Sequence, residues 1–510
     1  MKKRLARIGA FLVCMIIGLS TTMTAYAEEG YTYNYDWWEE VQYSPDAYEV
    51  VGVYTAAALG LDKKLNKPQG LFVSGNKVYI VDSGNNRIIE LVREGAESFS
   101  VSRIIEEFNG PVEVNTFNYP TDIAVSEEGD LYIADQNNGR VLKLDKDLNY
   151  ISEFVKPTDS TFDQSIDFLP SKIVIDTAGR VYCIAVNVNK GLIKYEPDGV
   201  FSGFVGATKV TYSWTDYIWK KFATKAQRAQ MENFVPTEYN NIYMDYDGFI
   251  YTCTNNVTTN DVRSGSVDPI RRLNMMGNDI LIRNGNFYVI GDVQMEAGGG
   301  YDGCSLIVDI TAMNNDVYVA LDKVRGRLFA YDDQGRLLYA FGGNGMMDGC
   351  FRQPIALDHM GHDLIVLDTL NCSITLFAPT SYGNDIYDAI EQFQNGQYNE
   401  SGETWQKVMD QNGNYDLAYI GIGRALMGEK KYKEALDYFK LKWDVSNYSK
   451  AFKQYRKEWV EENIMLIIAI VFLVLCVPLI IGKIKRIKFQ IDTADIFKYN
   501  LYDENKKEKK

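Results

Sequence analysis

The chain of 510 residues contains only two histidines, His359 and His362, three positions apart. Zinc sites in enzymes bind their metal through three or four histidine, cysteine or carboxylate side chains. A zinc centre built from histidines on several elements is excluded, because both histidines lie in one predicted hairpin. We interpret the pair as solvent-exposed residues of a turn rather than as metal ligands. In a strand–turn–helix context, the sequence has neither a glycine-rich phosphate loop nor a Gly-x-Ser-x-Gly nucleophile motif.

An acid and a base stand five residues apart in two segments, as Asp82 with Arg87 and as Asp135 with Arg140. Asparagine and glycine lie between them, and these residues tolerate the left-handed backbone of a tight hairpin. The acids and bases could belong to a functional site. However, the pattern recurs along the chain, and a functional site normally departs from a repeat. We therefore expect turn chemistry and pairing between strands.

The pattern belongs to a repeated unit, and most copies start about 50 residues apart. Each copy has three predicted strands separated by turns, and some copies add a fourth strand. Four-stranded sheets repeated radially form a β-propeller, so the fold class is mainly β, with a six-bladed propeller over 50–380. A strand at Tyr48–Tyr54 would complete the last blade and close the ring. The six copies cover 68–91, 120–144, 170–195, 236–273, 307–331 and 354–377.

These copies resemble the NHL-repeat family, whose repeats form six-bladed propellers. The resemblance is carried by PQGLFVSGNKVYIVDSGNNRIIEL at 68–91 and PTDIAVSEEGDLYIADQNNGRVLKL at 120–144. It is weaker in the third and fourth copies, where Ala185 and Thr254 replace the strand-end aspartate. The fifth copy keeps both Asp322 and Arg327. The last copy keeps the aspartate but has serine in place of the arginine.

Propeller enzymes work at the central channel, near the start of each innermost strand. The aligned copies place Gly70, Asp122, Lys172, Asn241, Asp309 and Ala356 there. We predict ligand binding by the polar members Asp122, Lys172, Asn241 and Asp309. Calcium-dependent lactonase-type propellers use channel oxygens, which three of these residues could supply, whereas Lys172 would place a cation among them. We assign no catalytic residue, no metal ligand and no cofactor, and Ca²⁺ stays an open alternative.

Both ends of the chain predict export and anchoring. Residues 1–27 combine a basic start, an apolar run and Ala25-Tyr26-Ala27, as in a secretory signal peptide. Residues 464–482 carry no charge and are long enough to cross the hydrocarbon core as one helix. The four cations that follow place the tail, 483–510, in the cytoplasm by the positive-inside rule: Lys483, Lys485, Arg486 and Lys488. The protein is thus predicted to be a single-pass membrane protein with an extracytoplasmic body.

The net charge and the cysteine content argue against two further classes of protein. The net charge is −15 although both ends are basic, so the body between them is strongly acidic and a poor partner for nucleic acid. Seven cysteines are too few for a scaffold held by disulfides. A bridge between Cys304 and Cys350 stays possible, because each ends an Asp-Gly-Cys triplet.

Two further segments flank the propeller. The aromatic leader at 28–49 could stack on a sugar, but such a segment more often packs on its own domain. From 384 to 462 the period becomes helical, and two stretches superpose at a spacing of 34 residues. Here Gly423 and Ala435 would let two helices approach closely. This region resembles a tetratricopeptide pair, with a plain helical spacer as the alternative.

We conclude from the sequence that the protein binds or scaffolds rather than catalyses. The expected partner is a membrane or cell-surface protein, with a small molecule or carbohydrate as a possible ligand. The alternative is a metal-dependent, lactonase-like hydrolase or lyase that uses the channel carboxylates. The predicted organisation is a signal peptide at 1–27, a leader at 28–49, an NHL-type propeller at 50–380 with a helical insert at 207–235, a tetratricopeptide-like region at 384–462, a transmembrane helix at 464–482 and a basic cytoplasmic tail at 483–510.

Overall fold

The structure is a computed structural model that describes residues 31–111, 115–206, 239–295 and 303–507. The predicted signal peptide at 1–27 and the helical insert at 207–235 lie outside the described residues. The chain divides into two compact units. One unit comprises Met1–Gln394 with Lys407–Leu417, and the other comprises Asn395–Gln406 with Ala418–Lys510.

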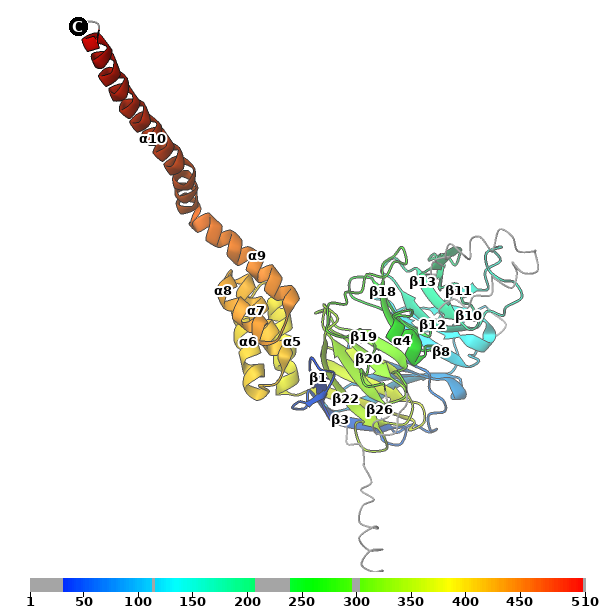
Figure 1. Ribbon diagram of the computed structural model, residues 1–510. Helices are drawn as coiled ribbons and strands as arrows, with labels where there is room; N and C mark the ends of the chain where they lie inside the picture. The colour runs from blue at the N-terminus through cyan, green and yellow to red at the C-terminus, as the bar shows by residue number, and fades with distance from the viewer. Residues whose placement is uncertain (1–30, 112–114, 207–238, 296–302, 508–510) are drawn as a thin grey trace, which may run out of the picture. The chain divides into compact units, whose positions relative to one another are not determined.

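The first unit consists of antiparallel sheets, each formed by successive strands of one repeat (Figure 1). The first three sheets are β4 (Gly70–Ser74), β5 (Lys77–Asp82), β6 (Arg87–Arg93) and β7 (Phe99–Ile105); β8 (Pro120–Val125), β9 (Leu131–Asp135), β10 (Arg140–Leu144) and β11 (Tyr150–Val155); and β12 (Pro170–Ile175), β13 (Val181–Ala185), β14 (Leu192–Tyr195) and β15 (Phe201–Val205). The next three sheets are β16 (Asn241–Met244), β17 (Ile250–Cys253) and β18 (Ile270–Leu273); β19 (Ile307–Ala312), β20 (Tyr318–Asp322), β21 (Arg327–Tyr331) and β22 (Leu337–Asn344); and β24 (Pro354–Met360), β25 (Asp363–Asp368), β26 (Ser373–Pro379) and β3 (Tyr48–Thr55).

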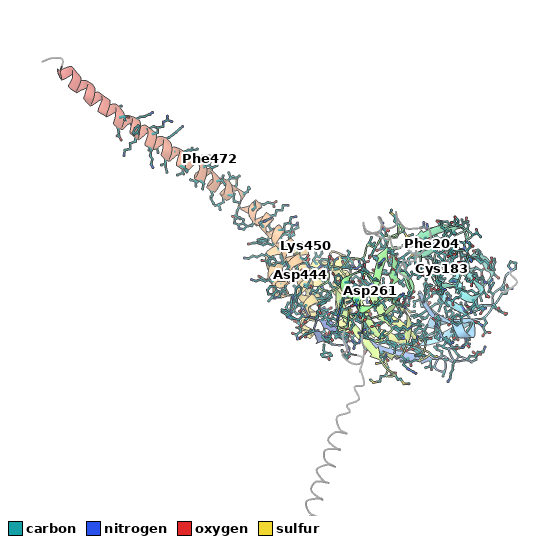
Figure 2. The ribbon with its side chains drawn as sticks, turned by 45° about the vertical axis from the view of Figure 1, so that its right-hand side comes forward. Cys183, Phe204, Asp261, Asp444, Lys450 and Phe472 are labelled. Carbon is teal, nitrogen blue, oxygen red and sulfur yellow. The ribbon has the colours of Figure 1, made fainter. Side chains whose placement is uncertain are left out.

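The innermost strands lie side by side around a closed ring, in the order β4, β8, β12, β16, β19, β24 and back to β4. Apolar side chains fill the space between neighbouring sheets, as between the second and third sheets, where Cys183 of β13 is buried (Figure 2). This arrangement is a β-propeller. The ring closes through β3, which pairs along its whole length with β26, so the closing strand predicted at Tyr48–Tyr54 is confirmed.

The prediction of six four-stranded blades is corrected to five, because the sheet β16–β18 has three strands among the described residues. The segment after β18 turns at Asn274, whose side chain accepts the backbone N–H groups of Met276 and Asn278. It returns to form only an isolated bridge between Leu273 and Asp279. The backbone pairing with β18 does not continue beyond this bridge, so the sheet has no fourth strand among the described residues.

The aromatic leader packs on its own domain. Strands β1 (Tyr33–Tyr35) and β2 (Val41–Tyr43) form a hairpin that joins the edge of β22 through Tyr33 and Ala340. Tyr33 is completely buried, whereas Trp38 at the hairpin turn is 78% exposed. The packing interpretation is therefore confirmed for the strands of the leader.

The strand-end aspartate of the first repeat holds three parts of its blade together. One oxygen of Asp82 accepts the backbone N–H of Asn66, in the segment that enters the blade, at 2.7 Å. The other oxygen accepts Arg87 Nε and Asn85 Nδ2, both at 2.8 Å. Asn86 then adopts the left-handed backbone that the hairpin requires, with φ at 54°. Asp82 and Arg87 are fully buried, so this is an internal structural ion pair.

The second repeat has the same contacts, while the fifth departs from them. Asp135 binds the Asn118 backbone N–H at 2.8 Å and Arg140 Nε at 3.0 Å. In the fifth repeat, Arg327 instead contacts Asp292 at 3.2 Å and the Tyr33 hydroxyl at 2.8 Å. The turn and pairing interpretation is confirmed in the first two repeats. In the fifth repeat Asp322 and Arg327 are still opposite each other in the strand register, but the arginine side chain binds Asp292, from a loop outside the repeat.

Helices follow the propeller strands. They are α5 (Ser381–Gln394), α6 (Tyr398–Gln411), α7 (Asp416–Gly428), α8 (Tyr432–Leu441), α9 (Val445–Glu462) and α10 (Ile464–Lys507). In the second unit a Cβ atom on Gly423 would lie 2.6 Å from the Phe439 ring, so glycine is needed where α7 meets α8. A Cβ atom on Gly421 would likewise lie 2.5 Å from the Trp405 ring.

Helix α10 contains one segment, Ile464–Ala494, that is long and apolar enough to cross a membrane. Its most apolar stretch has no buried side chain, and most side chains are exposed, as Phe472 illustrates (Figure 2). The helix does not end with the predicted span at 482 but runs on to Lys507. The six cysteines among the described residues are free thiols, so Cys304 and Cys350 are not bridged.

We predict that Asp82→Ala and Asp135→Ala each lower the free energy of unfolding by roughly 1–3 kcal/mol, because each change strands a buried arginine and a backbone N–H. Denaturant titration of the full chain measures this loss, with the exposed Asp147→Ala as the matched control. A loss from only one of the two strand-end variants would contradict the shared structural role.

Candidate functional site

A cavity of about 960 Å³ lies at the centre of the ring, and all six innermost strands line it. It extends from the starts of these strands to the hairpin turns at their other ends, where Gly75, Glu127, Thr177, Asp247 and Gly361 contribute. The backbone positions the lining side chains, because each innermost strand is fixed by its own sheet and by the two strands beside it in the ring. The cavity is therefore built from residues far apart in the sequence.

Strand register shows that the six predicted channel positions are equivalent. Each pairs with the residue just before the strand-end position of the second strand of its sheet. The pairs are Gly70 with Val81, Asp122 with Ala134, Lys172 with Ile184, Asn241 with Cys253, Asp309 with Leu321 and Ala356 with Leu367. The four polar members all line the cavity, whereas Gly70 and Ala356 do not. The structure thus brings the four candidate residues together.

Lys172 extends across the start of the channel. Its Nζ atom lies 3.7 Å from Asp122 Oδ1 and donates to the Gln69 carbonyl, in the first repeat, at 3.4 Å. The second oxygen of Asp122 accepts the backbone N–H of Ile173 at 2.9 Å. Burial raises the pKa of the Asp122 carboxyl, and the nearby Lys172 charge opposes that rise. Lys172 and Asp122 therefore form a mostly buried ion pair between two blades.

Asn241 and Asp309 form the matching contact on the other side. Asn241 Nδ2 donates to the Val308 carbonyl at 3.0 Å and to Asp309 Oδ1. Asp309 also accepts the backbone N–H groups of Ile310 at 2.8 Å and Leu357 at 2.7 Å. Burial raises the pKa of Asp309 to about 7, with the Lys172 charge opposing the rise. This carboxyl group links the fifth blade to the last.

These residues do not fit a calcium site. Ca²⁺ needs six to eight oxygen ligands, and the oxygens of Asp122, Asn241 and Asp309 already accept N–H groups. The Lys172 ammonium would also repel a divalent cation at this position. Among the residues that the structure describes, no three His, Cys, Asp or Glu side chains are grouped so that they could hold a metal ion.

Two residues of the channel were missed from the sequence, Asp358 and His359, both on β24. Asp358 accepts the backbone N–H of Val73 at 2.7 Å and so connects the last blade to the first. His359 is half-buried and lines the cavity, and its Nδ1 atom lies 2.7 Å from Thr311 Oγ1. The interpretation of His359 as a solvent-exposed turn residue is wrong, because the strand extends through Met360 before the chain turns.

His362 lies apart from the channel. Its ring stacks on Tyr387 of α5 with the ring centroids 4.6 Å apart. The two histidines of the hairpin therefore face different surroundings. The signal that could have separated them is the extent of the strand, because His359 still belongs to β24, whereas His362 lies in the two-residue turn between Met360 and Asp363.

Acidic groups dominate the lining. Its cations are Lys172 and Arg180, and Arg180 is paired with Asp176 at 2.6 Å. Seven carboxyl groups line the same cavity: Asp122, Glu127, Asp176, Asp245, Asp247, Asp309 and Asp358. A cleft lined by an excess of one charge concentrates ions of the opposite charge. The channel therefore favours cationic over anionic ligands.

An NHL repeat model matches residues 117–144, which span β8, β9 and β10. No curated protein matches the chain. Among solved structures, the chain is similar to a streptogramin B lyase with a TM-score of 0.39 and 13% identity, over 64% of this chain and 98% of that one. It is also similar to a virginiamycin B lyase from Staphylococcus aureus, with a TM-score of 0.36 and 14% identity over 66% and 89% of the two chains.

A third similar structure is described as the extracellular domain of a hybrid two-component system from B. thetaiotaomicron. Its TM-score is 0.36 at 10% identity, over 66% of this chain and 43% of that one. The NHL match confirms the repeat predicted at the second copy.

The raised pKa of Asp309 predicts a pH dependence with a definite sign. The unfolded residue loses its proton near its ordinary pKa of 3.8, whereas the folded residue keeps it until about pH 7. Between these values folding binds a proton, so the contribution of Asp309 to the free energy of unfolding falls as the pH rises. We predict that the stability of the wild type relative to Asp309→Asn decreases from pH 4 to pH 7.

Denaturant titrations of both proteins across this pH range provide the measurement, with the exposed Asp198→Asn as the control. A wild-type advantage that grows with pH would show that the carboxylate form of Asp309 is the stabilised one, contrary to this prediction.

Proposed function

We propose that this NHL-repeat propeller is a membrane-anchored, extracytoplasmic binding or scaffold protein that presents its channel to a ligand or partner and catalyses no reaction itself. The observation that carries the proposal is that the residues of the channel have two separate roles. Asp122, Asn241 and Asp309 are engaged in contacts between blades, while a cavity of about 960 Å³ stays open beyond them. The backbone N–H groups of the neighbouring blades hold Asp122 and Asp309 in place.

We further propose that the sheet β16–β18 acts as the sixth blade. Its support is the position of β16, which lies between β12 and β19 in the ring of innermost strands. Asn241 on this strand donates to the Val308 carbonyl of the fifth sheet, and Asp309 accepts the Leu357 N–H of the last, so both side chains link neighbouring sheets. A blade with three strands still contributes its innermost strand to the channel.

Anchoring is supported by helix α10. Its charge-free part, at 464–482, is followed by Lys483, Lys485, Arg486 and Lys488, and such flanking cations face the cytoplasm. The body before Ile464 then lies outside the cytoplasm, in agreement with the signal peptide proposed at 1–27. The tail proposed at 483–510 would be cytoplasmic.

Partners are proposed from the same arrangement. The helices over 384–462 would form a tetratricopeptide-like module, supported by the close packing at Gly423, and such modules bind other proteins. A membrane or cell-surface protein is the expected partner. A carbohydrate is a further possible ligand, because Trp37 and Trp38 are exposed at the leader hairpin.

Orientation is tested with single cysteines on the two sides of the apolar segment. In intact cells we expect a membrane-impermeant maleimide to label Ser446→Cys and to label Gln490→Cys only after permeabilisation. Both variants are made in a Cys372→Ser background, which also supplies the control, because Cys372 is partly exposed whereas Cys183, Cys253, Cys304 and Cys350 are buried. The reverse labelling pattern would contradict the proposed topology.

Absence of metal chemistry is tested by elemental analysis of the purified full chain. We expect neither Ca²⁺ nor Zn²⁺ at stoichiometric amounts. A stoichiometric metal that disappears in an Asp122→Ala, Asp309→Ala double variant would instead support the hydrolase or lyase alternative.

Affinity purification from detergent-solubilised membranes tests the partner, and recovery of the bait without any membrane protein would contradict that part of the proposal.

A further inference from the structure

His359 is held by a chain of hydrogen bonds that links two blades. Its Nδ1 atom lies 2.7 Å from Thr311 Oγ1 on β19, and Thr311 Oγ1 lies 3.2 Å from Asp358 Oδ1 on β24. Thr311 is completely buried. Asp358 is fixed in turn by the backbone N–H groups of Val73 and His359. The imidazole is therefore oriented from both its own strand and the neighbouring blade.

One tautomer of the neutral imidazole satisfies both contacts of the Thr311 hydroxyl. In that arrangement Thr311 Oγ1 donates its single proton to Asp358 Oδ1, and its oxygen accepts a proton from His359 Nδ1. Neutral imidazole carries one N–H group, so Nε2 is left as the acceptor. Within the described part of the chain, Nε2 has no hydrogen-bond partner, and the residue lines the cavity.

The surroundings of Nε2 select the charge of its ligand. Asp358 lies beside the ring on the same strand, with its Oδ1 atom 3.6 Å from Nδ1. Tyr243 of β16 packs near the ring, with the centroids 6.5 Å apart. Asp245 follows on the same segment of the cavity wall, where Arg272 binds it at 2.7 Å. A ligand group here meets an acceptor nitrogen beside the Asp358 carboxylate. A protonated amine suits both groups, because its N–H groups can donate to the Nε2 nitrogen and its positive charge is attracted by the carboxylate.

We propose that His359 is a ligand-contacting residue of the channel, that its Nε2 atom accepts an N–H group, and that the ligand is a protonated primary amine. The amine could belong to a free polyamine or to a lysine side chain of a protein partner. This inference rests on the proposed binding function, for which it names the ligand chemistry. Thr311 is the positioning residue that presents Nε2 to the cavity.

The chain supplies a matched control in His362. It lies in the same hairpin, but its ring stacks on Tyr387 instead of lining the channel. His362→Gln and His359→Gln therefore make the same chemical change on the same hairpin. Only the second change removes an acceptor from the channel.

Calorimetric titration of the detergent-solubilised full chain at pH 8 tests the contact. The probes are spermidine and Nα-acetyl-lysinamide. We expect at least one probe to bind, and we expect about tenfold or greater weakening in His359→Gln, as for the loss of a hydrogen bond to a charged group. His362→Gln should bind like the wild type. Binding of spermidine identifies a free amine as sufficient, whereas binding of lysinamide alone favours a partner's lysine.

A second readout follows the imidazole itself. The chain has only two histidines, so ¹⁵N-histidine labelling gives two sets of ring signals, and His362→Gln leaves those of His359. We expect the Nδ1–H tautomer in the free protein, a shift of the Nε2 signal on addition of the bound probe, and loss of the fixed tautomer in Thr311→Val.

Failure of both probes to bind would overturn the amine assignment. Equal weakening in the two histidine variants, or an Nε2–H tautomer, would overturn the role of His359. Neither result would affect the membrane partner tested by affinity purification, so failure of this inference is distinguishable from failure of the proposed function.

Discussion

The structure depends on closing a ring of sheets with strands from both ends of the propeller sequence. Strand β3 comes before the first repeat, yet it completes the last sheet by pairing with β26 from Tyr48 to Thr55. Closure forces the innermost strands to lie side by side around one axis. Carboxylates then join neighbouring blades at the axis, as Asp358 does between the last and the first. Without closure, the residues of the channel would not share a cavity.

Closure also creates an electrostatic cost at the axis. Strands that meet there bury Asp122 and Asp309 away from water, and burial disfavours their charged forms. The fold offsets this cost with backbone N–H groups and with the Lys172 ammonium. Farther along the channel, Arg180 pairs with Asp176, and Arg272, which is not among the lining residues, pairs with Asp245 and Asp247. Carboxyl groups still outnumber the cations along the lining, so the channel favours a cationic ligand over an anionic one.

The sequence predicted those parts of the fold that repeat. The strand-end aspartates set the alignment of the copies, and this alignment placed Asp122, Lys172, Asn241 and Asp309 at equivalent register positions. The strand at Tyr48–Tyr54 could be identified because it stood before the first repeat while the last repeat lacked a fourth strand.

The parts of the fold and of the site that the sequence did not predict depend on contacts that are specific to one blade. His359 points into the channel because Thr311 of the neighbouring blade binds its ring, and no periodicity in its own repeat reports that contact. Arg327 leaves its expected partner for Asp292, which comes from a loop outside the repeats. The fourth sheet lacks a strand because the chain turns at Asn274. Each of these departures is set by irregular segments, whose course depends on the assembled ring.

Ring closure is tested most directly by trapping the pairing of β3 with β26. Val53 and Thr375 are directly opposite in the register, so cysteines at these two positions lie on the same face of the sheet. Ile374 is adjacent to Thr375 and faces the other side, so Val53→Cys with Ile374→Cys is the matched control. After mild oxidation of the full chain, peptide mapping should find a disulfide in the 53–375 pair and none in the 53–374 pair. A disulfide in the control pair, or in neither pair, would contradict the closed ring.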